Sequence, residues 1–166
     1  MNLKNNQINF GTDGWRAIIA EDFTFENVRI CAQATAEYLK QNNIADKGFT
    51  IGYDTRFASE DFAKACAEVL AANGIKVELT TKPTPTPVVS YGVVAHKTAG
   101  AIIITASHNP AEYNGFKLKS SDGASAPTEF VRDVETNIHR IVDTGKVERM
   151  SLEQARRQGL VQFVDL

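Results

Sequence analysis

The residues best suited to chemistry are Ser107 and His108, in the polar stretch Thr105-Ala106-Ser107-His108-Asn109-Pro110. This stretch directly follows the apolar run 101–104, whose β-branched residues predict a buried strand that ends in a loop. In open α/β sheets, ligands bind just beyond the carboxyl ends of the strands, so a hydroxyl at this place suits nucleophilic chemistry. The same pattern also fits a turn that only satisfies its own backbone, and the local sequence leaves both interpretations open.

Cationic side chains decide which chemistry a serine could perform. A phosphoryl group on Ser107 would carry nearly two negative charges and would need cationic partners. Residues 116–119 alternate in polarity, so Lys117 and Lys119 share one face of a strand and Lys117 lies nearer the Ser107 loop. Arg16 and His108 are further residues of a suitable type. Each of them, taken singly, also fits an exposed surface residue.

A serine hydrolase is the competing enzymatic interpretation, and the sequence disfavours it. The chain contains no G-x-S-x-G motif. Adjacent Ser107 and His108 side chains seldom reach the geometry that a nucleophile and its base require.

The elements that must position these residues alternate between strands and helices. Strands are predicted at 15–19, 49–53, 75–79, 101–104 and 116–119. Helices are predicted after the N-caps Thr24 and Ser59, over 88–96, after Pro127, and briefly after Ser151. The pattern indicates a three-layer α/β/α fold with a mixed, mainly parallel sheet. Its last strand should be antiparallel, because Asn114-Gly115 is a reversal signal.

Composition sets limits on the function. A chain of 166 residues suits a single domain over 1–166, and a net charge of −2 gives no reason to expect nucleic acid as a partner. Cys31 and Cys66 lie in helical segments without metal-ligand spacing, which favours reduced packing residues. The sequence has neither a secretory signal nor an apolar run of roughly 18 residues, so we expect a cytoplasmic protein with no membrane partner.

Four motifs together resemble one enzyme family. They are the Ser107 stretch continued through Ala111-Glu112-Tyr113-Asn114-Gly115-Phe116-Lys117, together with Phe10-Gly11-Thr12-Asp13-Gly14-Trp15-Arg16, Gly52-Tyr53-Asp54-Thr55-Arg56 and Pro83-Thr84-Pro85-Thr86-Pro87. In type and order they resemble the first-domain signatures of the α-D-phosphohexomutases, the family of phosphoglucomutase and phosphomannomutase. The likeness covers about residues 10–120.

The resemblance implies a role for each matched residue. Ser107 would be the phosphoserine that interconverts hexose 1-phosphate and hexose 6-phosphate, of glucose, mannose or both, through a bisphosphate intermediate. His108 would position substrate, Lys117 would be a general acid or base, and Arg16 would face phosphate. Thr105 and Asn109 would contribute to substrate or phosphate binding, with Asn109 supporting the loop. Mg²⁺ would bind the Ser107 phosphate together with three aspartates.

Other family motifs do not occur in this chain. The aspartate-rich metal loop, the sugar-selection loop and the C-terminal phosphate clamp have no match. We therefore expect the chain to correspond to the first of four domains, with about 146–166 as a boundary or linker toward an absent second domain. By itself it should have little or no mutase activity, and its partners should be hexose phosphates and bisphosphates and the remaining domains of a parent enzyme.

Two alternatives to this parent stay open. One is a non-catalytic sugar-phosphate-binding or interaction module with the same fold. The other is a phosphoglucosamine mutase parent.

The apolar end 160–166 shows no obvious stop signal, as though a longer chain were cut there.

Overall fold

A computed structural model describes residues 8–11 and 14–166 of the chain. Thr12 and Asp13, which belong to the first motif, lie outside the described residues. The described strands are β1 (Trp15–Ile18), β2 (Phe49–Tyr53), β3 (Val77–Thr80), β4 (Gly100–Ile104), β5 (Tyr113–Ser120) and β6 (Val161–Val164). The helices are α1 (Phe25–Gln41), the short 3₁₀ helix η1 (Ala45–Lys47), α2 (Ser59–Ala72), α3 (Thr86–His96), α4 (Thr128–Thr144) and α5 (Leu152–Arg157).

The six strands form one mixed sheet in the order β1-β5-β4-β2-β3-β6. β5 is antiparallel to both of its neighbours, β1 and β4. The pairs of β2 with β4, β2 with β3, and β3 with β6 are parallel. This confirms the predicted α/β fold with a mixed, mainly parallel sheet, and it places the antiparallel strand inside the sheet, between β1 and β4.

The structure corrects two details of the sheet. The antiparallel strand is the fifth in the chain and not the last, because residues 161–164, where the sequence patterns predict no strand, add β6 in parallel register with β3. Asn114-Gly115 does not form the reversal: both residues lie within β5, and the chain turns in residues 105–112. The Asn114 side chain instead accepts a hydrogen bond from the Gly115 amide at 2.8 Å, so it stabilises the start of the strand.

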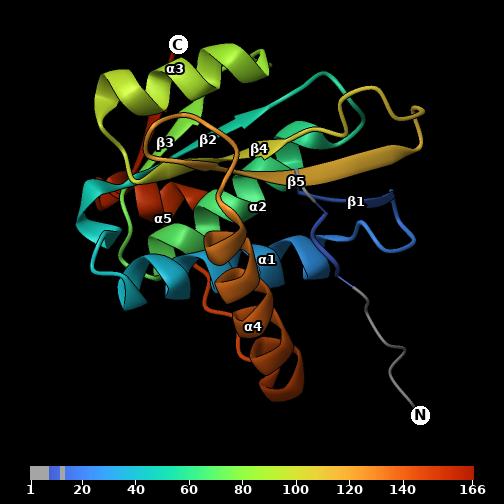
Figure 1. Cartoon of the computed structure of the whole chain (residues 1–166). Coiled ribbons are helices and arrows are strands. Elements are labelled where there is room, and N and C mark those ends of the chain that lie inside the picture. Colours follow the sequence, from blue (N-terminus) through green and yellow to red (C-terminus); the bar gives the residue numbers. More distant parts are fainter. Residues whose placement is uncertain (1–7, 12–13) are drawn as a thin grey trace.

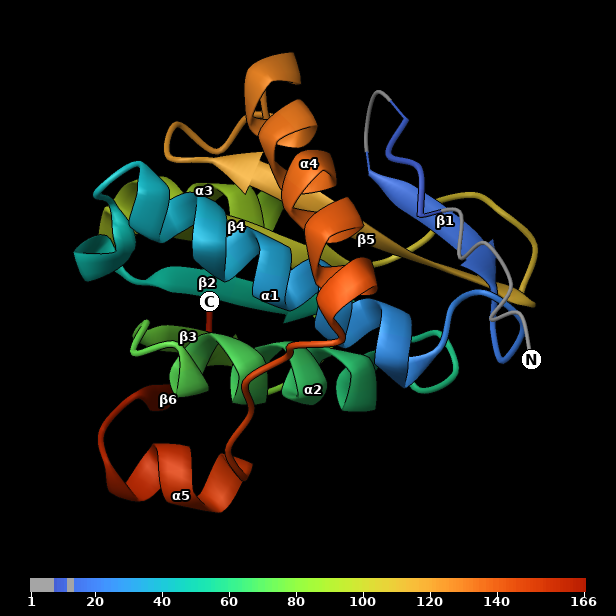
Figure 2. The ribbon, with the colours of Figure 1, turned by 90° about the horizontal axis from the view of Figure 1, so that it is seen from below.

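The helices form the two outer layers. Among the described helices, α3 is the one that lies over one face of the sheet, and α1, α2, α4 and α5 lie on the opposite side (Figure 1). Seen from that side, α1 and α2 run side by side in front of the sheet, and α4 crosses in front of α1 as an outer helix (Figure 2). Helices therefore cover both faces, as predicted. No helix within the described ranges is both long and apolar enough to span a membrane.

The core is correspondingly unequal on the two faces. On the side of α1 and α2, a large cluster of buried residues includes an aromatic set in which Phe23 stacks on Trp15 and meets Phe62 edge-on. On the side of α3, a separate small cluster contains Val89, Val93, Ala101 and Ile103. Cys31 and Cys66 are fully buried and free, which confirms them as packing residues.

Three helix starts were predicted from capping residues, and one of them is wrong. The Thr24 hydroxyl accepts a hydrogen bond from the Asn27 amide, and the Ser151 hydroxyl accepts one from the Gln154 amide, as N-caps do. Ser59 is not an N-cap: it is the first residue of α2, after Ala58 in a left-handed conformation. The reason is that its hydroxyl donates to the Asp54 carboxylate at 2.7 Å and is occupied there.

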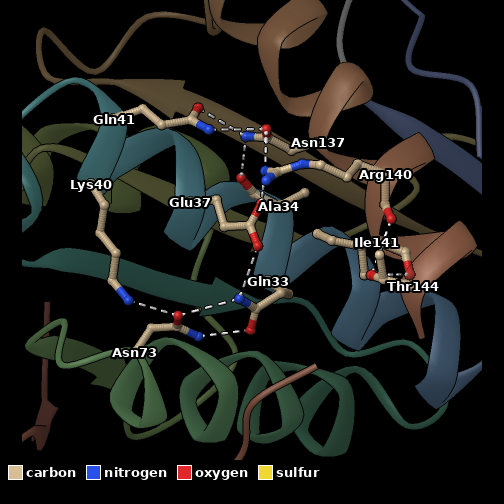
Figure 3. A network of polar contacts seen from close by, with 10 residues as sticks. All are labelled: Gln33, Ala34, Glu37, Lys40, Gln41, Asn73, Asn137, Arg140, Ile141 and Thr144. Atoms are coloured by element: carbon tan, nitrogen blue, oxygen red, sulfur yellow. Dashed lines mark hydrogen bonds and ion pairs between the residues drawn. The ribbon is translucent and has the colours of Figure 1, made fainter. Parts of the chain in front are cut away.

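A polar network joins α1 to α2 and α4 (Figure 3). The buried Asn137 side chain of α4 donates to the Ala34 carbonyl of α1 at 3.2 Å. The buried Gln33 carboxamide of α1 accepts from the Asn73 side chain at 2.8 Å and from the Glu148 amide at 3.1 Å. Hydrogen bonds to such partners offset the cost of removing the buried amides from water. The network therefore fixes α4 and the segment after it against the inner helices.

Candidate active site

Ser107 lies in the loop that joins β4 to β5, where the chain leaves the carboxyl end of a central strand. Ile104, the last residue of β4, is fully buried, whereas Ser107 is exposed. Ser107 has φ 59°, in the left-handed region that non-glycine residues seldom adopt. Such a conformation costs energy and is typical of turns and of functional sites.

Three other predicted residues of this loop play different parts. Thr105 is buried, and its hydroxyl accepts a hydrogen bond from the Ser107 amide at 3.0 Å. The Asn109 amide donates to the Ala106 carbonyl at 3.1 Å, so Asn109 shapes the turn. His108 is exposed beside Ser107. The loop thus presents the Ser107 and His108 side chains to solvent and uses Thr105 for support.

Arg16 and Lys117 project from the same face of the sheet. Trp15 on β1 and Phe116 on β5 are paired in register and point into the large core. The next residue on each strand, Arg16 and Lys117, must therefore point to the opposite face, the side of α3. Lys117 pairs with Ile103, which belongs to the small cluster on that side, and Lys117 is only 6% exposed.

Gly115 brings Arg16 close to the start of the loop. A Cβ on Gly115 would stand 2.5 Å from the Thr105 carbonyl oxygen and 3.1 Å from the Arg16 Cγ. The Arg16 side chain therefore lies across Gly115, beside the backbone of Thr105, and only glycine leaves room for it. Two cations thus line the sheet face at the point where the Ser107 loop departs.

Lys119 extends this cationic row away from the loop. It is 8% exposed and pairs with Ala101, and its ammonium group lies 3.4 Å from the Ser125 hydroxyl. The shared face of Lys117 and Lys119 is the one that alternation predicted.

Arg56 holds the loop, although no sequence pattern singles it out as a site residue. This residue follows β2, and its guanidinium donates four hydrogen bonds to main-chain carbonyl oxygens of the β4–β5 connection. Nη1 donates to Pro110 at 2.7 Å and to Tyr113 at 3.0 Å, and Nη2 donates to Ser107 at 3.0 Å and to Asn109 at 2.6 Å. In the sequence Arg56 stands out only as part of a motif, because contacts with distant backbone leave no local signal.

The Arg56 side chain is itself fixed by Asp54. One carboxylate oxygen, Oδ2, lies 3.3 Å from the Arg56 Nε. The other, Oδ1, accepts hydrogen bonds from the Arg56 amide at 2.9 Å and from the Ser59 hydroxyl at 2.7 Å. The Ser59 hydroxyl in turn accepts from the Asn114 side chain at 2.9 Å, so the network returns to the start of β5.

These residues do not form a complete site for Mg²⁺. Hard divalent cations need several oxygen ligands. Within residues 8–11 and 14–166, no three His, Cys, Asp or Glu side chains are placed to hold a metal ion together. Asp54 is committed to Arg56, and Asp122 lies elsewhere on an exposed turn. Hydrogen bonds from the Ser120 hydroxyl and the Ala124 amide lower the pKa of Asp122 below its ordinary value.

Comparison with known proteins relates the chain to sugar-phosphate mutases. Residues 7–144 match the family model described as phosphoglucomutase/phosphomannomutase, alpha/beta/alpha domain I. The chain is 33% identical over 164 residues to the phosphoglucomutase of Komagataeibacter xylinus, with 92% of this chain and 29% of that protein covered. It is 31% identical over 175 residues to the human glucose 1,6-bisphosphate synthase, with 92% and 28% covered.

A solved structure gives the same result for the fold. A protein from Thermus thermophilus, whose name gives phosphomannomutase as a provisional activity, superposes with a TM-score of 0.80 at 35% identity. The match covers 96% of this chain and 33% of that protein. The chain therefore spans about a third or less of the length of these relatives.

Proposed function

The chain belongs to the phosphoglucomutase/phosphomannomutase family as its α/β/α domain I, and on that premise we propose that Ser107 is its phosphoryl carrier. Membership confirms the family resemblance drawn from the four motifs. The observation that carries the proposal is the exposed Ser107 on a loop tied down by Arg56, at the edge of a sheet face that holds Arg16 and Lys117.

The proposed reaction has two half-steps. A hydroxyl of a hexose monophosphate attacks the phosphorus on Ser107, the bond from phosphorus to Ser107 Oγ breaks, and a hexose bisphosphate forms. The attacking hydroxyl gives its proton to Lys117 as general base, and Lys117 then returns it, as general acid, to the Ser107 oxygen. In the second half-step the Ser107 hydroxyl attacks the other phosphorus of the bisphosphate, and the bond from that phosphorus to the sugar oxygen breaks. The Ser107 proton passes to the sugar oxygen, which leaves the isomeric monophosphate.

The other site residues support the charge and position of the phosphoryl group. Arg16 offsets the phosphate charge, which is close to two negative charges at neutral pH. His108 positions substrate beside Ser107, and Thr105 and Asn109 shape the phosphate-binding loop. Glucose, mannose or both are the proposed sugars. The human relative's name, glucose 1,6-bisphosphate synthase, supports a hexose bisphosphate as a ligand.

We propose that the remaining parts of the catalytic site lie outside this chain. The Ser107 phosphate would offer one oxygen to Mg²⁺, and the described residues do not complete a cation site. The chain spans about 29% of the Komagataeibacter relative, which supports its assignment as one domain of a longer enzyme. The isolated chain should therefore show little turnover in a coupled assay from glucose 1-phosphate to glucose 6-phosphate. Turnover close to that of a full-length relative would contradict this.

Phosphoryl labelling tests the role of Ser107 directly. The chain is incubated for hours with an excess of glucose 1,6-bisphosphate or mannose 1,6-bisphosphate and Mg²⁺, and its intact mass is followed with peptide mapping of residues 99–117. One slow transfer per molecule is enough for this measurement, so it does not need the repeated turnover that the isolated chain should lack. We expect the gain of one phosphoryl group on Ser107. Ser107→Ala should abolish the gain, and Ser121→Ala, at another exposed serine, should leave it unchanged. Phosphate on any other residue would contradict the assignment.

A further inference from the structure

We propose that Arg56 is the positioning residue of the site: it sets the loop conformation in which Ser107 presents its hydroxyl or phosphate. The inference rests on the proposed function in so far as Ser107 is the reacting group. All four carbonyl groups that Arg56 contacts belong to the chain between Ser107 and Tyr113. With its Nη donors occupied in this way, Arg56 acts through the loop and not on the substrate.

Besides Arg56, the segment after β1 also holds the loop near its end, where the Ile19 amide donates to the Glu112 carbonyl at 2.8 Å. Among the described residues, its own turns supply the bond from the Ser107 amide to the Thr105 hydroxyl, the bond from the Asn109 amide to the Ala106 carbonyl, and one from the Tyr113 amide to the Pro110 carbonyl at 3.1 Å. Ser107 must also stay in the left-handed region, at φ 59°. The bond from Arg56 Nη2 to the Ser107 carbonyl falls on this strained residue, so Arg56 stabilises the conformation that is hardest to maintain.

The network behind Arg56 ties both ends of the loop to one support. Asp54 orients the guanidinium and binds Ser59, and Ser59 binds Asn114 at the start of β5. Ser59 and Asn114 are buried, so their bonds are protected from water. At the other end, the Asp54 amide donates to the carbonyl of Ile104, the last residue of β4, at 3.1 Å. The loop is therefore clamped where it leaves β4 and where it enters β5.

Only a guanidinium fits this role. Its planar fork offers donors in two directions, whereas a lysine ammonium is a single point with three donors. Arg56→Lys keeps the charge but cannot span the four carbonyl oxygens. Because a displacement of about 1 Å at a reacting group can slow a reaction by roughly a hundredfold, loss of this clamp should affect phosphoryl transfer strongly.

The first test measures the loop without any reaction. Amide hydrogen exchange is compared for the unphosphorylated wild type, Arg56→Ala, Arg56→Lys, and the control Arg132→Ala, an exposed arginine paired only with neighbouring Asp133 among the described residues. In both Arg56 variants we expect the amides of Ser107, Asn109 and Tyr113 to exchange about tenfold faster or more, with β2 and β4 unchanged. Millimolar guanidinium chloride should partly restore protection in Arg56→Ala, and equal sodium chloride should not.

The second test measures Ser107 labelling by glucose 1,6-bisphosphate in the same variants. Labelling should be about a hundredfold slower in Arg56→Ala and Arg56→Lys, with partial rescue of Arg56→Ala by guanidinium, and normal in Arg132→Ala.

The outcomes separate this inference from the proposed function. Unchanged loop exchange, or faster exchange throughout the sheet, would overturn the positioning role. Normal labelling of Arg56→Ala would also overturn it, with the function of Ser107 intact. If the wild type itself fails to accept phosphate over the same hours, the proposed labelling of this chain by a bisphosphate is contradicted, and the exchange and rescue results still decide whether Arg56 holds the loop.

Discussion

Ser107 combines exposure with a strained backbone. Its side chain is exposed, and the part of the chain that the structure describes offers no hydrogen-bond partner for its hydroxyl. Its φ of 59° nevertheless favours glycine. A serine in this conformation is worse for stability than a glycine would be, so its presence is explained more readily by the chemistry of the hydroxyl than by the fold.

Two substitutions at Ser107 separate backbone strain from the hydroxyl. Ser107→Ala should change the free energy of unfolding by less than about 0.5 kcal/mol, because an exposed hydroxyl without a partner contributes little. Ser107→Gly should be more stable than Ser107→Ala by about 0.5–1 kcal/mol, because glycine adopts positive φ without a Cβ clash. Urea unfolding followed by circular dichroism measures both. A loss of several kcal/mol in Ser107→Ala would instead give the hydroxyl a structural role.

Sequence patterns predict the position of Ser107 but not the residues that hold it. A β-branched run followed by a polar turn places the loop at the carboxyl end of a strand, and β4 ends at Ile104 as that pattern predicts. Arg56 escapes the same reasoning, because its partners are carbonyl oxygens 51 to 57 positions further along the chain. Every residue type has a main-chain carbonyl, so the residue types at these positions do not indicate the contact with Arg56.

At the scale of elements, the contact between α3 and the sheet depends on one glycine. Gly52 lies in β2 under α3, and a Cβ there would stand 2.5 Å from the Val89 Cγ2. α3 is the only described helix on this face, so its approach sets the packing of the whole layer (Figure 1).

A double-mutant cycle tests this contact. Gly52→Ala should destabilise the chain by about 1–3 kcal/mol, since the added methyl group overpacks the interface. Val89→Ala should cost about 2 kcal/mol through lost burial and a cavity. The double variant should lose at least about 1 kcal/mol less stability than the sum of the two single losses. The reason is that the shortened Val89 side chain makes room for the methyl group added at Gly52. Gly52→Ala combined with Leu39→Ala, on the opposite face, should be additive. Additivity of the Gly52 and Val89 changes would contradict the close contact.

The elements that sequence patterns miss are those fixed by partners far away. Residues 161–164 form β6 because β3 offers a free edge, with Val77 opposite Val161, and a short apolar run alone does not reveal that edge. Ser59 has the residue type of an N-cap, yet the Asp54 carboxylate takes its hydroxyl. In both cases a tertiary contact overrides a local preference that was otherwise sound.

The whole molecule is asymmetric, with most of its core on one side of the sheet. Four helices and the large core cover one face, and the other face carries α3, the small cluster and the cationic row of Arg16, Lys117 and Lys119 (Figures 1 and 2). This division places stability on one side and the candidate chemistry on the other. Substitutions at the site should consequently change function more than global stability.

The reactivity of the two cysteines shows whether α1 and α2 stay packed together in the large core. Cys31 in α1 and Cys66 in α2 are fully buried, and burial raises the pKa of each thiol. The nearby Cys66 raises the pKa of Cys31 further. Since the thiolate is the reactive form, both groups lack the charge as well as the access that alkylation requires.

Iodoacetamide should therefore alkylate the two cysteines only after global unfolding. A Ser121→Cys variant, which adds an exposed thiol, sets the timescale of the reaction at pH 8. Over the time in which that thiol is modified, the intact mass of the native chain should show no modification of Cys31 or Cys66. Near the urea midpoint both should react at the same rate, because α1 and α2 share one core and open together. Native-state reaction of one cysteine at the rate of the Ser121→Cys thiol would contradict this. It would show that α1 and α2 separate while the sheet stays folded, so that stability would not be distributed as the packing indicates.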